Sequence, residues 1–444
     1  MSPEESPAPE GQNVPLSRNR NYQLLWVSQV LSGVGLSASV IAFPLLVLAL
    51  TRSAAASGLV LGAITTAQLL AGLPAGALAD RWDRKTIMLS CEATQMIAAA
   101  SLVAALWWNV VPIPYLIVVG AVIGICGALF RPAENACLPR VVPADQLSVA
   151  VALNTARGSV AQLSGTAAGG FLFGIARFVP FVADAVAHGL ACVLLVFLRV
   201  PPREVRPVPT RHLGREIMAG LQWVWASRHI RVTALCAVAL NLFISAFFLI
   251  VIVLLQAQGV SSGQIGIIAA MLGVGGLLGA VVASRLSHLI SPYLAIVAVL
   301  WGLGTLTLVA AFVGGGWLLG VLFATMALLP PTANTAIITR QLLLTPDELR
   351  GRLSSVLGIG TGVAAALGPV LGGVLAAALS GTHAVLVCAG GITAVAVVAT
   401  LSPTLRSFPR QPVVAESPGA QPGPLAETTP VRRADRHDVA KKGD

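Results

Sequence analysis

Residues 230–257 read IRVTALCAVALNLFISAFFLIVIVLLQA, and beyond Arg231 this stretch contains no charged side chain. A helix of about 20 predominantly apolar residues is long enough to cross the roughly 30 Å hydrocarbon layer of a bilayer. Every backbone polar group in that layer must be hydrogen-bonded internally, which favours a helix over any open structure. The stretch is therefore predicted to be a membrane-spanning helix.

Eleven further stretches have the same character. The chain of 444 residues is 56% hydrophobic and only 10% charged, with a mean hydropathy of +0.84, which excludes an ordinary soluble protein. We predict an all-α membrane protein with twelve transmembrane helices in two six-helix, pseudo-symmetric halves. The predicted spans are residues 22–50, 55–79, 86–108, 112–134, 149–176, 178–200, 230–257, 262–284, 291–312, 316–339, 350–379 and 382–402.

The polar segments divide the chain into five predicted parts. The two ends are rich in Pro, Gly and charge and have too few apolar residues to form a core. In the central linker, Ile217, Leu221, Val224 and Trp225 recur at helical spacing, which is typical of an amphipathic helix lying on a membrane surface. The predicted parts are a disordered cytoplasmic head (1–17), an N-terminal six-helix bundle (18–200), a cytoplasmic linker with an amphipathic helix (201–229), a C-terminal six-helix bundle (230–402) and a disordered cytoplasmic tail (403–444).

The net charge of +10 raises the alternative of a nucleic-acid-binding protein. Of the 28 Lys and Arg residues, all but Arg52, Arg177 and Arg157 fall in segments that share one side of the membrane if the N-terminus is inside. This distribution follows the positive-inside rule and indicates topology rather than a nucleic-acid partner. We therefore expect a multi-pass protein of the bacterial plasma membrane with both termini in the cytoplasm.

The two halves of the sequence repeat short motifs in the same order. Chance explains one such match more easily than three, so we predict a duplicated six-helix unit. Two parallel halves of this kind bind their solute at the interface between them in many transporters. The matches are Pro132–Asn135 with Pro331–Asn334, Pro143–Leu147 with Pro346–Leu349, and Gly169–Gly170 with Gly372–Gly373.

Residues 76–85, GALADRWDRK, lie between the second and third spans. A glycine allows two helices to approach closely, and an acid among several cations at a helix end can form an interhelical latch. The alternative is that the cations only follow the positive-inside bias, but that bias does not require the two acids. The predicted latch residues are Gly76, Asp80, Arg81, Asp83, Arg84 and Lys85.

This motif resembles the loop signature of the major facilitator superfamily, G-x-L-x-D-R-x-x-R-K, and every defining position is present. Residues 130–154, 182–185 and 215–231 resemble the drug, macrolide and siderophore exporters of that superfamily. The resemblance covers about residues 18–402 and implies that Arg131 is the partner of Asp80. The second copy of the loop, expected near residues 279–285, lacks the acid.

The eleventh span contains Gly368, Pro369, Gly372 and Gly373, which resemble the G-P-x-x-G-G element of exchangers in this superfamily. The fifth span has Gly165, Gly169 and Gly170 in the same pattern without the proline. Small residues permit close helix crossing, and a proline introduces a kink. Two roles stay open, a simple packing seam and a part in setting the direction of exchange.

Charged side chains inside spans are costly and mark functional sites by default. Asp184, Glu92, Glu134 and Arg157 are the candidates for proton coupling. Asp184 and Glu92 are the better proton carriers, because burial disfavours the charged form of a carboxylate, but Asp184 could instead have a purely structural role. Glu134 ends the fourth span near Arg131, where it could reach water or the Asp80 motif, and Arg157 lies in the fifth span. Several members of the family that the chain resembles have an acid after the glycine of the first span, where this chain has Leu36 after Gly35.

Six uncharged polar residues within the spans are candidates for the lining of a substrate path. The alternative is that they form hydrogen bonds between helices. Few charges are available inside the spans to bind an ionic substrate, which favours an amphiphilic, largely apolar small molecule. The candidates are Gln29, Ser32, Gln68, Asn154, Gln162 and Asn241.

Several chemistries are excluded by missing motifs. None of the three lysines follows a G-x-x-x-x-G sequence, and no H-E-x-x-H, G-x-S-x-G or C-x-x-C pattern occurs. We expect no cofactor and no metal. The sequence predicts a monomeric secondary transporter that exports small molecules by alternating access in exchange for protons. Alternatives are an uptake permease of the same fold, a membrane enzyme or a sensor that does not transport.

Overall fold

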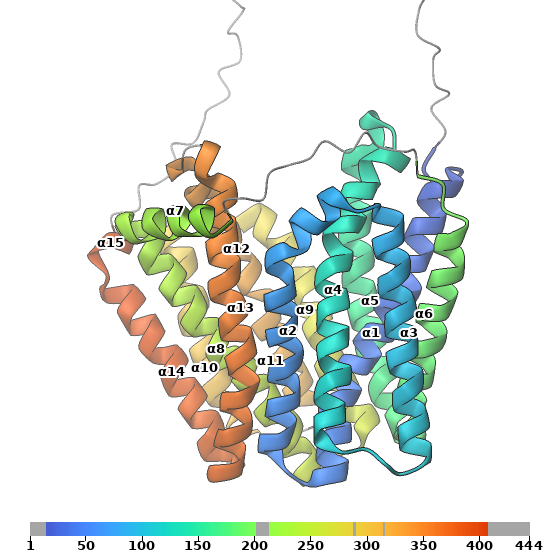
Figure 1. The fold of residues 1–444 in the computed structure, drawn as a ribbon. Coiled ribbons are helices and arrows are strands. Elements are labelled where there is room, and N and C mark those ends of the chain that lie inside the picture. The colour runs from blue at the N-terminus through green and yellow to red at the C-terminus, as the bar shows by residue number, and fades with distance from the viewer. Residues whose placement is uncertain (1–14, 201–212, 287–289, 314–315, 346, 407–444) are drawn as a thin grey trace, which may run out of the picture. The chain divides into compact units, whose positions relative to one another are not determined.

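The computed structural model describes residues 15–200, 213–286, 290–313, 316–345 and 347–406. The side chains of a few residues inside helices, Asp80 among them, are also outside this description. The described part consists of helices joined by short connections, with no strand among these residues (Figure 1).

Six long helices form the first half of the chain, and a single 3-10 turn, Ala144–Gln146, lies between the fourth and the fifth. They are α1 (Arg20–Thr51), α2 (Ala54–Arg81), α3 (Arg84–Trp107), α4 (Ile113–Val141), α5 (Leu147–Ile175) and α6 (Val179–Val196).

The second half begins with a linker helix and ends with a single short turn of helix. Its helices are α7 (Leu213–Ala226), α8 (Arg228–Ala257), α9 (Ser262–Leu286), α10 (Pro292–Ala310), α11 (Trp317–Leu328), α12 (Pro330–Leu344), α13 (Asp347–Ala378), α14 (Gly381–Leu401) and α15 (Pro403–Arg406).

Eleven helical segments in the described part of the chain are long and apolar enough to span a membrane, with α11 and α12 together counting as one. The twelfth spanning helix is α5, which has 29 residues but a lower hydropathy because Asn154, Arg157 and Gln162 lie within it. It packs lengthwise against α1 and α9, two helices that qualify. The predicted all-α membrane fold with twelve spans is therefore confirmed.

Two segments differ from their predicted form. The span expected at 316–339 is divided into α11 and α12 at Leu329, because Pro330 and Pro331 have no N–H for the helical ladder. The predicted disordered tail also begins too early. Residues 403–406 form α15, where Leu405 is fully buried and the Arg406 Nε donates to the Thr400 carbonyl at 2.9 Å. Residues 407–444 and 1–14 lie outside the described residues.

Local sequence explains the sharp turns between neighbouring helices. The Asn19 and Ser53 side chains accept hydrogen bonds from the Tyr22 and Ala56 backbone N–H groups, at the starts of α1 and α2. Such caps satisfy amide groups that have no partner within the first helical turn. Between these helices Arg52 adopts a left-handed conformation with φ of 52°, which reverses the chain in very few residues.

The two ends of the helical bundle differ in charge. The start of α1 and the α2–α3 connection have Arg20, Arg81, Arg84 and Lys85, and we call this the basic end. The opposite end, which contains the α1–α2 turn at Arg52, is called the Arg52 end. Figure 1 shows the basic end at the top, where α7 lies crosswise to the long helices.

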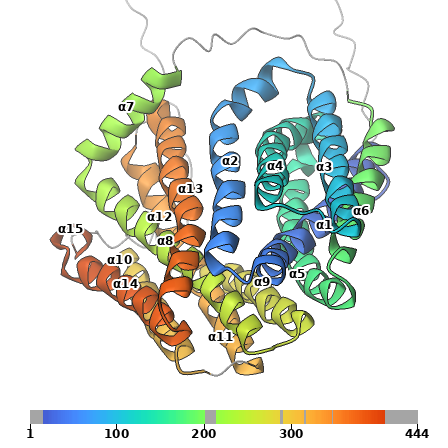
Figure 2. The ribbon, with the colours of Figure 1, turned by 60° about the horizontal axis from the view of Figure 1, so that its bottom comes forward.

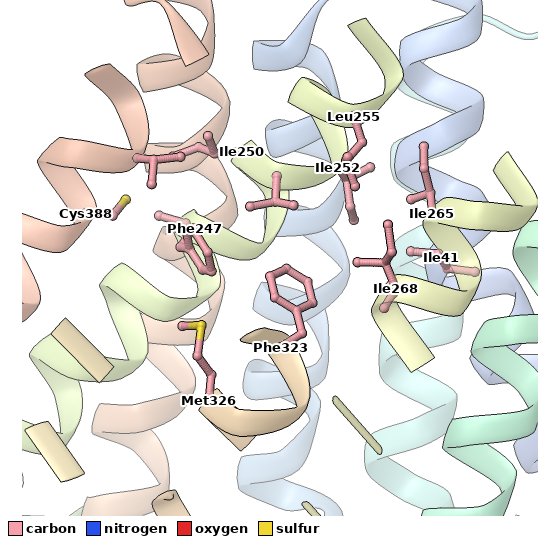
Figure 3. Close-up of a cluster of buried hydrophobic side chains, with 14 of the residues drawn as sticks. Ile41, Phe247, Ile250, Ile252, Leu255, Ile265, Ile268, Phe323, Met326 and Cys388 are labelled. Atoms are coloured by element: carbon pink, nitrogen blue, oxygen red, sulfur yellow. The ribbon is translucent and has the colours of Figure 1, made fainter. Parts of the chain in front are cut away.

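Toward the Arg52 end, hydrophobic packing joins the two halves. There a single buried cluster includes residues of both halves, and Figure 3 shows Ile41 of α1 beside Ile265 and Ile268 of α9. At the basic end, one cluster around Met88 contains only first-half residues. Another, around Leu353, contains only residues of α7, α8 and α13. The apolar core thus closes the bundle at one end.

Candidate functional site: the interface between the halves and a buried polar cluster

Two helix pairs form the main contacts between the halves. The helix α2 packs along α13, and α5 packs along α9 (Figure 2). In each pair, one helix carries one of the glycine patterns of the fifth and eleventh spans. These two crossings therefore determine how closely the halves can approach each other.

At the Arg52 end, both crossings are made by facing glycines. A Cβ on Gly266 of α9 would lie 2.8 Å from the Gly170 Cα, and a Cβ on Gly373 of α13 would lie 3.1 Å from the Gly58 Cα. Real Cβ atoms hardly ever come within 3.0 Å of another atom, and the Cβ on Gly373 would also lie 2.6 Å from the Ala54 carbonyl oxygen. The backbones can therefore approach this closely only because these side chains are absent. The same geometry thus occurs twice, as the internal repeat predicts.

The glycines that precede Gly170 and Gly373 in the sequence pack against helices of their own halves. A Cβ on Gly169 would lie 2.6 Å from the Ala38 Cα of α1, and a Cβ on Gly372 would lie 3.0 Å from the Ala246 Cα of α8. Gly165 and Gly368 pack one turn away against the same two helices, α1 and α8. Each double glycine therefore connects a helix of its own half to a helix of the other half.

Toward the basic end, α2 and α13 separate. Gly76 of α2 lies 18 residues, or five turns, from Gly58 and so faces the same direction. A Cβ at Gly76, at Gly72 or at Gly358 of α13 would meet no atom within 4 Å, apart from its own helix. The close helix approach predicted at Gly76 is therefore wrong for this conformation, because the crossing has already opened there.

The charged loop motif connects helices of the first half. Asp83 caps α3 by accepting from the Thr86 N–H at 2.8 Å. The Arg84 Nη1 donates to the Ala136 carbonyl of α4 at 2.5 Å, and the Lys85 Nζ donates to the Val196 carbonyl of α6 at 2.7 Å.

Arg81 of the motif and Arg131 of α4, the implied partner of Asp80, both have exposed side chains. The Asp80 side chain lies outside the described residues, so the predicted pairing with Arg131 stays a prediction.

Glu134 and Arg157 form an ion pair between α4 and α5. The Arg157 Nη2 lies 2.7 Å from the Glu134 Oε1, and both side chains are about nine-tenths buried, with 11% and 10% exposed. The sequence placed Glu134 near water or the Asp80 motif and offered no partner for Arg157. The pairing needs α4 and α5 to pack side by side, which the sequence pattern does not specify.

A buried polar cluster lies between α1, α3 and α6. The Glu92 Oε2 is 2.6 Å from the His188 Nδ1, and the Ser39 hydroxyl donates to the Asp184 Oδ2 at 2.7 Å. The His188 Nε2 is 3.3 Å from the Asp184 Oδ1, but neither atom has a hydrogen-bond partner. All four side chains are buried, so we call them the Glu92–Ser39 cluster.

His188 was not among the predicted site residues. The sequence contained one usable signal, because His188 follows Asp184 by four residues and must therefore lie on the same helix face. The contact with Glu92 joins residues that are 96 positions apart and depends on the packing of α3 on α6. Gly35 contributes too, because a Cβ there would lie 2.8 Å from the Asp184 Oδ1.

The six uncharged polar candidates occupy different environments. Gln29 and Ser32 are buried in α1, while Gln68, Gln162 and Asn241 are exposed. Ser32 and Asn241 bond to carbonyl groups of their own helices. The Gln29 Nε2 and the Asn154 Oδ1 are buried without a partner, so these two are the candidates with unmet hydrogen-bonding capacity.

Buried ionisable groups are distributed unequally between the halves. Among the described residues, every buried Asp, Glu and His side chain belongs to the first half. The buried polar side chains of the second half are threonines, and its core around Phe247, Ile250 and Cys388 is apolar (Figure 3). In the described part of the chain, no three His, Cys, Asp or Glu side chains are arranged to hold a metal ion.

Comparison with known proteins identifies the class. A family model described as a transmembrane secretion effector of the major facilitator type matches residues 11–430. The fold is also that of solved transporters. One is a bacterial homologue of the human lysosomal transporter Spinster in an inward-facing conformation, with a TM-score of 0.70 and 17% identity over 88% of this chain and 98% of that one.

Another solved structure is a bacterial homologue of the iron transporter ferroportin, also inward-facing, with a TM-score of 0.67 and 16% identity over 87% of this chain and 99% of that one. These likenesses establish the fold. The chain belongs to the transmembrane secretion effector family of the major facilitator superfamily, and it is a secondary transporter of that type.

Two curated relatives have similar sequences over most of their length. The enterobactin exporter EntS of Shigella dysenteriae is 26% identical over 373 residues, which cover 81% of this chain and 88% of that protein. The MFS-type transporter YfiS of Bacillus subtilis, whose activity is uncharacterised, is 27% identical over 432 residues, which cover 92% and 99%.

Proposed function

We propose that this protein exports small amphiphilic molecules across a bacterial plasma membrane by alternating access, in exchange for protons. The observation that carries the proposal is the unequal closure of the bundle. The halves meet through glycine contacts and a shared apolar core at the Arg52 end, and they separate at the basic end. A central site reached from one side at a time is what alternating access requires.

The distribution of charge supports an orientation for this arrangement. Under the positive-inside rule the basic end faces the cytoplasm, so both termini lie inside. In this orientation the open side is the cytoplasmic one, and the conformation is ready to take up a solute from the cytosol or the inner leaflet. Similarity to an enterobactin exporter supports export as the direction. The resemblance of residues 130–154, 182–185 and 215–231 to drug, macrolide and siderophore exporters supports compounds of these kinds as the substrate class.

Proton exchange is assigned to the first half of the chain. Asp184 and Glu92 are the preferred carriers, because their carboxylates are buried and adjoin another ionisable side chain. Glu134 is a weaker candidate, since its carboxylate is already bonded to the Arg157 guanidinium at 2.7 Å. Among the described residues of the second half, no Asp, Glu or His side chain is buried, although the Cys388 thiol is.

The loop at residues 76–85 is proposed to latch the basic end when it closes. In the outward-open state α2 would approach α13 along the face that contains Gly76. Asp80 would then contact a basic side chain or the N-terminal end of a helix. Replacement of Asp80 by Asn removes the charge with little change in size. We expect Asp80→Asn to abolish efflux while the protein remains folded in the membrane. Wild-type efflux by this variant would refute the latch.

An efflux screen in a pump-deficient bacterial host tests the whole proposal. Cells with the wild-type chain, the Asp80→Asn variant or an empty vector are loaded with ethidium, erythromycin or enterobactin, with and without a protonophore. We expect lower retention of at least one compound with the wild type alone, and loss of that difference with the protonophore. Greater accumulation would indicate an uptake permease. No difference for any compound would favour a sensor or a membrane enzyme.

A further inference from the structure

Within the proposed proton exchange, we propose that the Glu92–Ser39 cluster is the proton-loading site, with His188 as its central carrier, and that it is connected mechanically to the closure of the Arg52 end. This inference rests on the proposed function and specifies the atoms and the path of coupling.

The hydrogen bonds of the cluster show where a proton can be added. The 2.6 Å contact between the Glu92 Oε2 and the His188 Nδ1 already requires one proton between the two atoms. The His188 Nε2 and the Asp184 Oδ1 face each other at 3.3 Å, and both are buried without a hydrogen-bond partner. A second proton at that contact would turn two unmet polar atoms into a donor and an acceptor.

The charge of the cluster gives the driving force. With one proton on the imidazole, Glu92 and Asp184 together carry a charge of about −2, and burying uncompensated charge away from water is costly. On loading, a hydronium ion transfers its proton, a new N–H or O–H bond forms, one water molecule is released and the net charge falls to about −1. Histidine is suited to this step, because one ring nitrogen can gain or lose a proton while the other stays bonded to Glu92.

Other titratable groups near the cluster are few. From α3 and α4, the thiols of Cys91 and Cys126 adjoin Glu92 and His188, and Cys192 lies one turn further along α6. On α1 there is none between Tyr22 and Arg52, and the one charged residue of α5, Arg157, is bonded to Glu134. His188 interacts electrostatically with the two carboxylates of the cluster and with the Cys126 thiol.

The cluster is connected to the glycine crossing between α5 and α9, which closes the Arg52 end and which we call the seal. The connection runs through two adjacent residues of α1 and two adjacent residues of α5. Ser39 bonds to Asp184, and its neighbour Ala38 packs against Gly169 of α5. The next residue, Gly170, packs against Gly266 of the second half. A change in how α1 packs against Asp184 therefore reaches the glycine crossing at the Arg52 end through direct contacts only.

The sign of the coupling follows from this path. In the loaded cluster, the bond between Asp184 and His188 fixes the carboxylate that accepts from Ser39, so α1 is held and the Arg52 end stays closed. Loss of the proton leaves two acceptors facing each other, which loosens the contact and favours opening. We therefore expect opening of the Arg52 end to increase as pH rises, as an exporter that returns inward in its proton-loaded form requires.

The test measures this opening without a substrate. In a background without native cysteines, spin labels at Ile175→Cys of α5 and Ser261→Cys, just before α9, report the distance across the Arg52 end in lipid nanodiscs from about pH 5.5 to 10.5. Wild-type protein should shift toward longer distances as pH rises. His188→Gln and Asp184→Asn should lose the shift, and the exposed His383→Gln on α14 should keep it.

Ser39→Ala supplies a second, milder variant that tests the connection itself. It should still take up protons in a pH-jump measurement, but its label distance should no longer follow pH. A wild-type distance that ignores pH, or a His188→Gln protein with the wild-type profile, would overturn the inference. These results differ from failure of the proposed function, which would appear as cellular efflux that a protonophore does not affect.

Discussion

Two pairs of ionisable side chains are buried between helices of the first half, His188 with Glu92 and Arg157 with Glu134. Asp184 and Glu92 could be selected from the sequence because an ionisable group inside a span is exceptional. His188 could have been selected on the same ground, supported by its four-residue spacing from Asp184. The pairing of His188 with Glu92, and of Arg157 with Glu134, could not, because each depends on which helices become neighbours.

The Glu134–Arg157 pair allows a stability prediction at this scale. Removal of one partner leaves a buried charge without compensation, which costs about 3–5 kcal/mol. Glu134→Gln and Arg157→Gln should each lower the thermal unfolding temperature of the purified protein, and the double variant should lose less than the sum of both. Strictly additive losses would show that the two side chains do not interact in the membrane.

At the scale of helices, the lipid environment made the spans predictable, since a crossing needs a minimum apolar length. The break between α11 and α12 was signalled by Pro330 and Pro331, but a proline in a membrane helix is often accommodated by a kink alone. The glycine patterns indicated close packing. Only the structure shows that Gly169 and Gly170 face different halves, because the sequence does not specify which neighbour each side of α5 meets.

The glycine crossing between α5 and α9 provides the second prediction. A methyl group at Gly170 collides with the backbone of Gly266, and overpacking of this kind costs about 1–3 kcal/mol. In a background without native cysteines, Gly170→Ala should destabilise the closed Arg52 end. Ile265→Cys, which replaces a buried side chain of the seal, should then react faster with a membrane-impermeant maleimide.

Gly174 is the matched control on the same helix, because a Cβ there meets nothing within 4 Å apart from its own helix. Gly174→Ala should leave the labelling rate of Ile265→Cys unchanged. Equal rates in the Gly170 and Gly174 variants would mean that this crossing does not control the closure.

At the scale of the whole molecule, duplication gives two similar halves that have diverged in chemistry. Both halves use a double glycine to pack on their own first spanning helix and to reach the second spanning helix of the other half. Only the first half has buried acidic and histidine side chains among the described residues. The repeat was predictable from sequence. The conformation was not predictable, because one sequence can be compatible with two alternative packings of its halves.

The central claim is that the basic end closes during transport, and a disulfide across that end tests it most directly. Along α2 and α13, Gly58 faces Gly373 and Leu69 faces Gly362, so the same register continues to Gly72 and Gly358, which now meet nothing. A disulfide needs Cα atoms within about 7 Å. Gly72→Cys with Gly358→Cys, without native cysteines, should crosslink under oxidation during efflux and stop it reversibly. Efflux at the full rate with no crosslink would contradict the account.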